Sequence, residues 1–98
     1  MRGGTPTLIS TITPTLSNSA QTISLSGHNK VYVVLTGYRY GAQNIVNEYD
    51  GNRNILINES NSVNSNIQLW ELTGSTYISF KSWSHGDSVM SALIYAID

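Results

Sequence analysis

The stretch that decides the fold is residues 30–36, Lys-Val-Tyr-Val-Val-Leu-Thr, in which apolar side chains occupy both odd and even positions. Its β-branched and aromatic residues favour a strand over a helix. A strand that is apolar on both faces is typical of one covered by other layers on both sides. We therefore expect residues 30–36 to form a central, doubly covered strand.

Other strands are expected on both sides of this stretch. Residues 21–26 alternate polar and apolar side chains, with Ile23 and Leu25 on one face. Residues 88–97 are apolar on both faces, which should place them inside a sheet or in an interface and not at a free edge. Further short strands are expected at 44–49, 54–59, 67–72 and 76–83, the third with an irregularity near Trp70-Glu71 and with Trp70 in the core.

This spacing predicts one all-β domain. About seven or eight short strands recur at roughly 8–12 residues, and no window favours a helix, a pattern typical of an antiparallel β-sandwich or jelly roll. We assign residues 20–98 to this sandwich. Asp50-Gly51-Asn52-Arg53 joins two of the strands and predicts a hairpin, because Asp-Gly readily adopts positive φ. That hairpin would make Glu48 and Glu59 cross-strand neighbours.

The first nineteen residues differ from the rest. They hold both prolines of the chain and are rich in Thr and Ser. Proline cannot donate a hydrogen bond within a sheet, so it favours an edge or an arm. Residues 1–19 are therefore expected to form an extended arm or edge segment. Four aliphatic side chains give it a possible assembly surface, namely Leu8, Ile9, Ile12 and Leu16.

Composition excludes several classes of protein. Ser, Thr and Asn make up 33 of the 98 residues, while only 11% are charged and the net charge is −1. A nucleic-acid binder would carry a basic patch, and the five Lys and Arg residues are scattered. No apolar run is long enough for a membrane helix, and Met1-Arg2-Gly3-Gly4 does not begin a secretory signal. Without cysteine, the core must be stabilised by packing, by oligomerisation or by both.

One group of residues could contact a ligand or a partner. Tyr38-Arg39-Tyr40 follows the central strand, and Trp83 and His85 lie near another turn. Aromatic rings and guanidinium groups stack on sugars and are enriched in protein interfaces. The alternative is that Tyr38 or Tyr40 closes one end of the sandwich with its ring buried. Both interpretations stay open at the level of sequence.

Asp50, Asn52 and Asn54 form a second candidate surface. Their alternation resembles the opening of a calcium-binding loop, but Ile55 stands where that loop needs glycine and Asn61 where it needs glutamate. A polar turn accounts for the same residues. The chain therefore predicts no metal, no cofactor and no catalytic residues. Ser84-His85-Gly86-Asp87 holds the residue types of a hydrolase triad, but neighbours in sequence cannot converge as a triad requires.

The whole chain resembles small virion modules of tailed bacteriophages, namely head-decoration proteins and the head domains of tail fibres. The resemblance rests on the Thr/Pro/Ser stretch at 5–19, the cysteine-free Asn/Ser/Thr-rich strands, and the ending Ala92-Leu93-Ile94-Tyr95-Ala96-Ile97-Asp98. It implies a location in the virion, a homo-oligomer with a trimer favoured, and capsid or tail proteins as partners. The sequence has no collagen-like or heptad stalk that would make it a complete fibre. If Met1 is the natural start, a standalone accessory protein fits better than a fibre tip.

Two functions follow as expectations. The first is a non-enzymatic virion structural or interaction protein, either head decoration or a receptor-binding accessory, that assembles through its arm and its apolar strands. The alternative is a carbohydrate-binding, lectin-like module that holds a cell-surface glycan with its Tyr, Trp, Arg and Asn side chains, since amides pair well with sugar hydroxyls.

Overall fold

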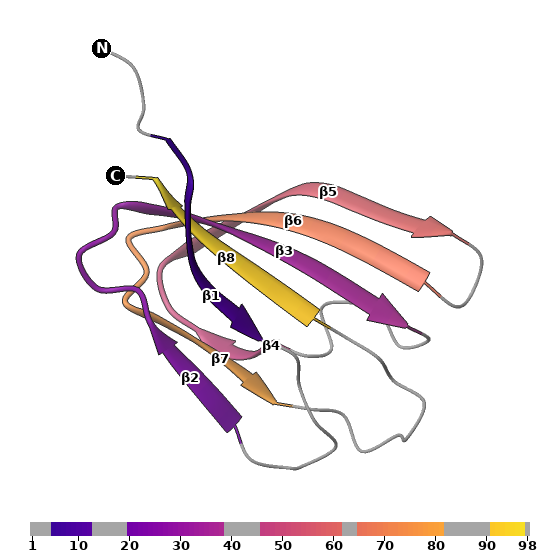
Figure 1. The fold of residues 1–98 in the computed structure, drawn as a ribbon, viewed down its shortest axis with the longest axis horizontal. Helices are drawn as coiled ribbons and strands as arrows, with labels where there is room; N and C mark the ends of the chain where they lie inside the picture. Colours follow the sequence, from indigo (N-terminus) through magenta and orange to yellow (C-terminus); the bar gives the residue numbers. More distant parts are fainter. Residues whose placement is uncertain (1–4, 13–19, 39–45, 62–64, 82–90, 98) are drawn as a thin grey trace.

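The structure, a computed structural model, describes residues 5–12, 20–38, 46–61, 65–81 and 91–97. Every regular element in these ranges is a β-strand (Figure 1). The strands are β1 (Thr7–Ile12), β2 (Ala20–Ser24), β3 (Lys30–Tyr38), β4 (Val46–Tyr49), β5 (Asn52–Asn61), β6 (Ser65–Thr73), β7 (Tyr77–Lys81) and β8 (Ser91–Ile97). The described residues contain no helix long and apolar enough to cross a membrane. The expected all-β class is confirmed.

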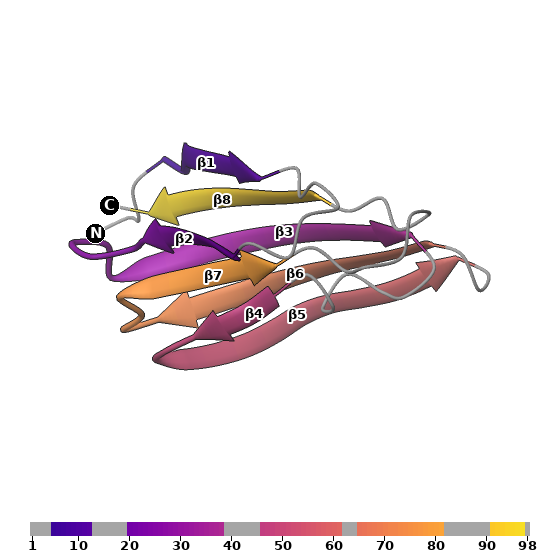
Figure 2. The same ribbon diagram turned by 90° about the horizontal axis from the view of Figure 1, so that it is seen from below.

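The strands form two antiparallel sheets. One has five strands in the order β1-β8-β3-β6-β5, and the other has three in the order β2-β7-β4. Figure 2 shows the five-stranded sheet running from β1 at the top to β5 at the bottom, with β2, β7 and β4 in front of it. This arrangement of two layers is compatible with the single-domain sandwich that the strand spacing predicts.

The core lies between the two sheets. The five-stranded sheet contributes alternate residues of β3, β6 and β8, while the three-stranded side contributes Leu25, Ile78 and Phe80. The β3, β6 and β8 residues are each at most 1% exposed, and they are Val31, Val33, Leu35, Trp70, Leu72, Ala92, Ile94 and Ala96. We call this face of the five-stranded sheet the inner face. It is built by the period-two alternation of side chains along each strand.

Two expectations for apolar strands meet different outcomes. The 30–36 stretch lies in β3, the middle strand of its sheet, and β8 lies between β1 and β3 and so inside the sheet, as expected. Double covering is not what the described residues show. The described strands cover only the inner face of β3, and Tyr32 and Val34 on its other face are partly exposed. The second sheet has three strands and covers one side only.

The predicted arm is partly a strand of the sandwich. Residues 7–12 form β1, which pairs with β8 and is an edge strand of the five-stranded sheet. Pro6 immediately precedes this strand, where its missing N–H costs no ladder hydrogen bond. Ile9 packs against the core, whereas Leu8 remains 49% exposed on the opposite face. The side chain of Ile12, and Leu16 with the rest of 13–19, lie outside the described residues.

The hairpin expected around Asp50-Gly51 is wrong. β4 belongs to the three-stranded sheet and pairs with β7, whereas β5 belongs to the five-stranded sheet and pairs with β6. The turn therefore crosses from one sheet to the other. Glu48 lies opposite Ser79 and Glu59 opposite Ile67, so these two carboxylates are not cross-strand neighbours. Local turn chemistry is the same in both cases, and only the pairing of the strands distinguishes them.

The irregularity expected near Trp70 occurs on the neighbouring strand. Ile55 lies opposite Trp70, and Ile57 lies opposite Leu69, so Leu56 is an extra residue in β5. Such a β-bulge changes which side chains of the strand face inward. In a regular strand Arg53 and Ile57 would lie on the same face. Because of the bulge, Arg53 lies on the inner face opposite Leu72, whereas Ile57 lies on the opposite face beside Leu69.

Ile94 should be a sensitive position for stability. Its side chain is fully buried in the middle of β8. Ile94→Ala removes three carbons from a packed site and should lower the free energy of unfolding by about 2–5 kcal/mol. Urea denaturation measures this loss. Ile57→Ala is the matched control, since Ile57 is 44% exposed and its truncation should cost far less in a dilute sample. Equal losses for the two variants would contradict the placement of the core.

Candidate interaction surface

The most distinctive surface is the side of the five-stranded sheet that faces away from the core. We call it the outer face. Residues that lie directly opposite each other on paired strands share a face, and this alternation places apolar side chains of all five strands together. They are Leu8, Tyr32, Val34, Ile57, Ile67, Leu69, Leu93, Tyr95 and Ile97. No described strand covers them.

A continuous aliphatic row crosses the middle of the outer face. Leu93 of β8 lies opposite Val34 of β3, Val34 opposite Leu69 of β6, and Leu69 opposite Ile57 of β5. Ile67 adjoins this row on β6. Ile57 and Ile67 are each 44% exposed, and Leu93, Val34 and Leu69 are partly exposed. Four strands thus present aliphatic side chains to solvent in one line.

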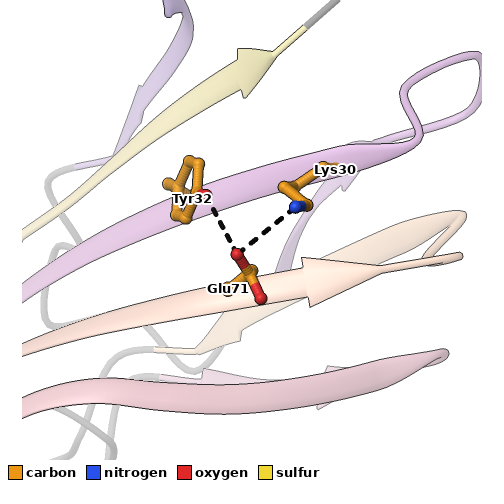
Figure 3. Close-up of polar contacts among 3 residues, drawn as sticks. All are labelled: Lys30, Tyr32 and Glu71. Atoms are coloured by element: carbon orange, nitrogen blue, oxygen red, sulfur yellow. Dashed lines mark hydrogen bonds and ion pairs between the residues drawn. The ribbon is translucent and has the colours of Figure 1, made fainter. Parts of the chain in front are cut away.

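A second row beside the first is polar at one end. Leu8 lies opposite Tyr95, Tyr95 opposite Tyr32, and Tyr32 opposite Glu71. The Tyr32 hydroxyl donates a hydrogen bond of 2.9 Å to Glu71 Oε2, and Lys30 Nζ lies 3.6 Å from the same oxygen. Figure 3 shows both contacts converging on Glu71 from β3. These three polar side chains hold one another in place at the border of the apolar surface.

This polar cluster removes most of the charge from the outer face. Lys30 and Glu71 have opposite charges and form an ion pair whose side chains are 44% and 22% exposed. An exposed pair of this kind contributes little to stability. Tyr32 donates a hydrogen bond to the Glu71 carboxylate, and this bond raises the pKa of Tyr32 above its usual value. Desolvation of the hydroxyl acts in the same direction. Tyr32 therefore stays a neutral hydroxyl at physiological pH.

Asp50 connects the two turns that cross between the sheets. Its carboxylate accepts hydrogen bonds from the Thr76 hydroxyl (2.5 Å), the Thr76 N–H (2.7 Å) and the Tyr77 N–H (3.2 Å). Its main-chain oxygen accepts another from the Ser75 hydroxyl at 2.7 Å. The β4–β5 turn is thereby attached to the β6–β7 turn. Asp50 has a structural role here.

Gly51 makes this close approach possible. Its φ is +81°, a left-handed conformation that favours glycine. A Cβ at this position would lie 2.6 Å from Ser75 Oγ and 2.8 Å from the Thr73 carbonyl oxygen. The Asp-Gly pair is therefore used as the sequence predicts for its positive φ, but in a connection between sheets.

A third cluster lies at the β5 side of the inner face. The Arg53 guanidinium carbon lies 4.6 Å from the Trp70 ring centre and 5.5 Å from that of Tyr49, and the two rings meet edge to face at 5.8 Å. Trp70 Nε1 donates to Gln68 Oε1 at 2.7 Å, and Gln68 Nε2 donates to Asn58 Oδ1 at 3.2 Å. The indole N–H of the buried Trp70 therefore has a hydrogen-bond acceptor, and the Trp70 ring is in contact with Arg53 and Tyr49.

The residues singled out from the sequence do not form one site in the described structure. Asp50 bonds to residues 76 and 77, whereas Asn52 and Asn54 lie opposite Thr73 and Glu71 on β5. The backbone of Tyr38 ends β3, but its side chain lies outside the described residues, as do all of Arg39, Tyr40, Trp83 and His85. No group of three potential metal-binding His, Asp or Glu side chains occurs in the described part of the chain.

Sequence reasoning noted the apolar strands but missed the outer face as one surface. The signal was present in β3, β6 and β8, whose second faces are apolar as well as their first. The same pattern is typical of strands that other layers cover on both sides. Comparisons with protein-family models, with curated proteins and with solved structures find no match to this chain.

Stability should fall at acidic pH because of Asp50. The Thr76 hydroxyl, together with the N–H groups of Thr76 and Tyr77, holds the pKa of the Asp50 carboxyl below its usual value of 3.8. The folded state thus favours the ionised form. This stabilisation is fully present above pH 3.8 and is lost as the pH falls through the lower, folded-state pKa. Thermal unfolding of the wild type between pH 7 and pH 2 should show this loss.

The control for this effect is Asp50→Asn, which keeps an acceptor oxygen but cannot titrate. It should be less stable than the wild type at neutral pH, and the difference should shrink below pH 3.8. Parallel stability curves for the two proteins across the acidic range would contradict the role assigned to the carboxylate.

Proposed function

We propose that this protein is a non-enzymatic structural and interaction module that contacts other protein chains through the outer face of its five-stranded sheet. The observation that carries the proposal is the aliphatic row Leu93–Val34–Leu69–Ile57, which Ile67 adjoins on β6. Large contiguous apolar patches are rare on the surfaces of monomeric proteins and mark contact sites. The outer face has the apolar character of such a site.

The chemistry of the outer face favours contact with a protein over contact with a sugar. Carbohydrate sites combine exposed rings with hydrogen-bonding groups, whereas the centre of this face is aliphatic. The Tyr32 hydroxyl, at its border, already donates to Glu71. The carbohydrate-binding alternative depends on Tyr38, Arg39, Tyr40 and Trp83, which His85 could join, and on Asp50, Asn52 and Asn54 of the 50–54 turn. Asp50 is bonded to residues 76 and 77. The part of the chain that the structure describes offers no observation that favours this alternative.

The setting we propose is the virion of a tailed bacteriophage. The resemblance to head-decoration and tail-fibre modules motivates it, and the low charge and all-β fold are compatible with it. In such a setting the outer face would be covered by a capsid or tail protein, or by another copy of this chain. The edge strand β1, which carries the exposed Leu8, would extend the same contact surface.

Cysteine labelling tests whether the outer face is open in the single chain. The protein has no cysteine, so one introduced thiol is the only reactive one. Val34→Cys places it in the aliphatic row, and Val33→Cys places it one residue away on the fully buried inner face. In a sample diluted until its mass is that of one chain, the Val34→Cys thiol should react with a maleimide much faster than the Val33→Cys thiol.

The same two variants also give the result that would contradict the proposed function. If Val34→Cys is as protected as Val33→Cys in the monomer, the chain itself covers its outer face and the proposal is wrong. Protection that appears only when chains associate supports it, because the partner then provides the cover.

A further inference from the structure

We infer that the outer face packs against the outer face of a second copy of this chain, forming a two-fold, face-to-face dimer. The inference rests on the proposed function, since it names the partner of the same surface. Three properties of the described residues carry it, namely the charge of the face, the order of its rows, and its area.

The charge of the outer face suits a second copy. Lys30 and Glu71 neutralise each other at 3.6 Å, and among the described charged residues of this face only Glu59 lies outside that pair, towards the far end of β5. The whole chain has a net charge of −1. Bringing two such faces together therefore meets little electrostatic repulsion. A differently charged partner would find few charges here to recognise.

The order of the rows makes the face self-complementary. β3 and β6 are neighbours in the middle of the surface, with β8 beyond one and β5 beyond the other. A two-fold axis parallel to the strands and between β3 and β6 would place Val34 over Leu69 of the second copy. The same axis places Leu93 over Ile57, so the aliphatic row meets itself along its length. Isologous contacts of this kind are the commonest in homo-oligomers.

The neighbouring row also matches under this operation. Tyr32 comes to lie over Glu71 of the second copy, and Tyr95 over Asn54, because these residues occupy symmetric places in the row. The Tyr32 hydroxyl keeps its hydrogen bond to Glu71 of its own chain. The Tyr95 hydroxyl meets the Asn54 amide, whose oxygen can accept a hydrogen bond. The same symmetry that buries the aliphatic row thus places polar groups opposite polar groups at this end of the face.

The area fits a weak dimer. Under this axis β8, β3, β6 and β5 lie over one another, and β1 has no counterpart. Four strands about 4.8 Å apart and about seven residues long give an overlap of about 19 by 23 Å. The two faces together would bury roughly 900 Å², which is within the range of weak protein interfaces. Sheets packed face to face lie about 10 Å apart with their side chains interleaved, which suits aliphatic rows.

Sedimentation equilibrium over a wide concentration range tests the dimer with a matched pair of variants. Ile57→Glu places a charge on the outer face, whereas Ile55→Glu places the same charge two residues away on the other side of the sheet. The two side chains are similarly exposed, at 44% and 39%. The wild type should approach twice the mass of one chain. Ile57→Glu should weaken association about 100-fold or more, since each dimer contains two substituted sites, and Ile55→Glu should associate like the wild type.

A second outer-face variant guards against a purely local effect. Ile67→Glu, at an equally exposed position on β6, should weaken association as Ile57→Glu does. Circular dichroism of all three variants shows that each is folded, which is expected because none of the substituted side chains is buried.

Other outcomes overturn the inference. A wild type that stays monomeric at the highest concentrations while the Val34→Cys thiol remains reactive would disprove the dimer and leave the proposed function standing, with a different protein as the partner. A trimer, which the resemblance to virion modules implied, would exclude a two-fold face-to-face contact. Dissociation by Ile55→Glu but not by Ile57→Glu would place the contact on another surface.

Discussion

The structure depends on the alternation of side chains along β3. Val31, Val33 and Leu35 point into the core and are at most 1% exposed, so every second residue faces the other way. A one-residue shift in register would exchange these faces. Since β3 pairs with both β6 and β8, this alternation also sets which faces of those strands are buried. The inner and outer faces of the whole sheet thus follow from one strand.

The two sheets are joined where Asp50 bonds to the turn before β7. Its carboxylate binds the Thr76 and Tyr77 N–H groups, and Gly51 lets the two turns approach closely. Backbone N–H groups in a turn that connects two sheets have no partner on a neighbouring strand. A carboxylate that accepts hydrogen bonds from several of these groups therefore stabilises the connection. Asp50, one of the residues that first suggested a cation site, instead joins the two turns at this end of the sandwich.

The outer face lowers the stability of the single chain and favours its association with another chain. Leaving aliphatic side chains such as Val34 and Leu69 in water forgoes stabilisation that a small, cysteine-free domain needs. Covering them with another chain would recover this stabilisation, so assembly and stability are coupled in the proposed function.

The edge strand β5 carries features that disfavour regular pairing with further strands. They are its bulge at Leu56 and the charges of Arg53 and Glu59.

By itself, the sequence determined the all-β class, the middle position of β3, the inside position of β8 and the buried Trp70, because these depend on local propensity and on period-two patterns. It determined the positive φ of Gly51 but not the strands that this turn connects. Only the tertiary structure decided that β4 and β5 belong to different sheets, that Glu48 and Glu59 are not cross-strand neighbours, and that no described strand covers the second face of β3. Pairing between segments distant in sequence is set by the packing of the whole core, and a local pattern that is apolar on both faces is the same whether a second layer belongs to this chain or to another.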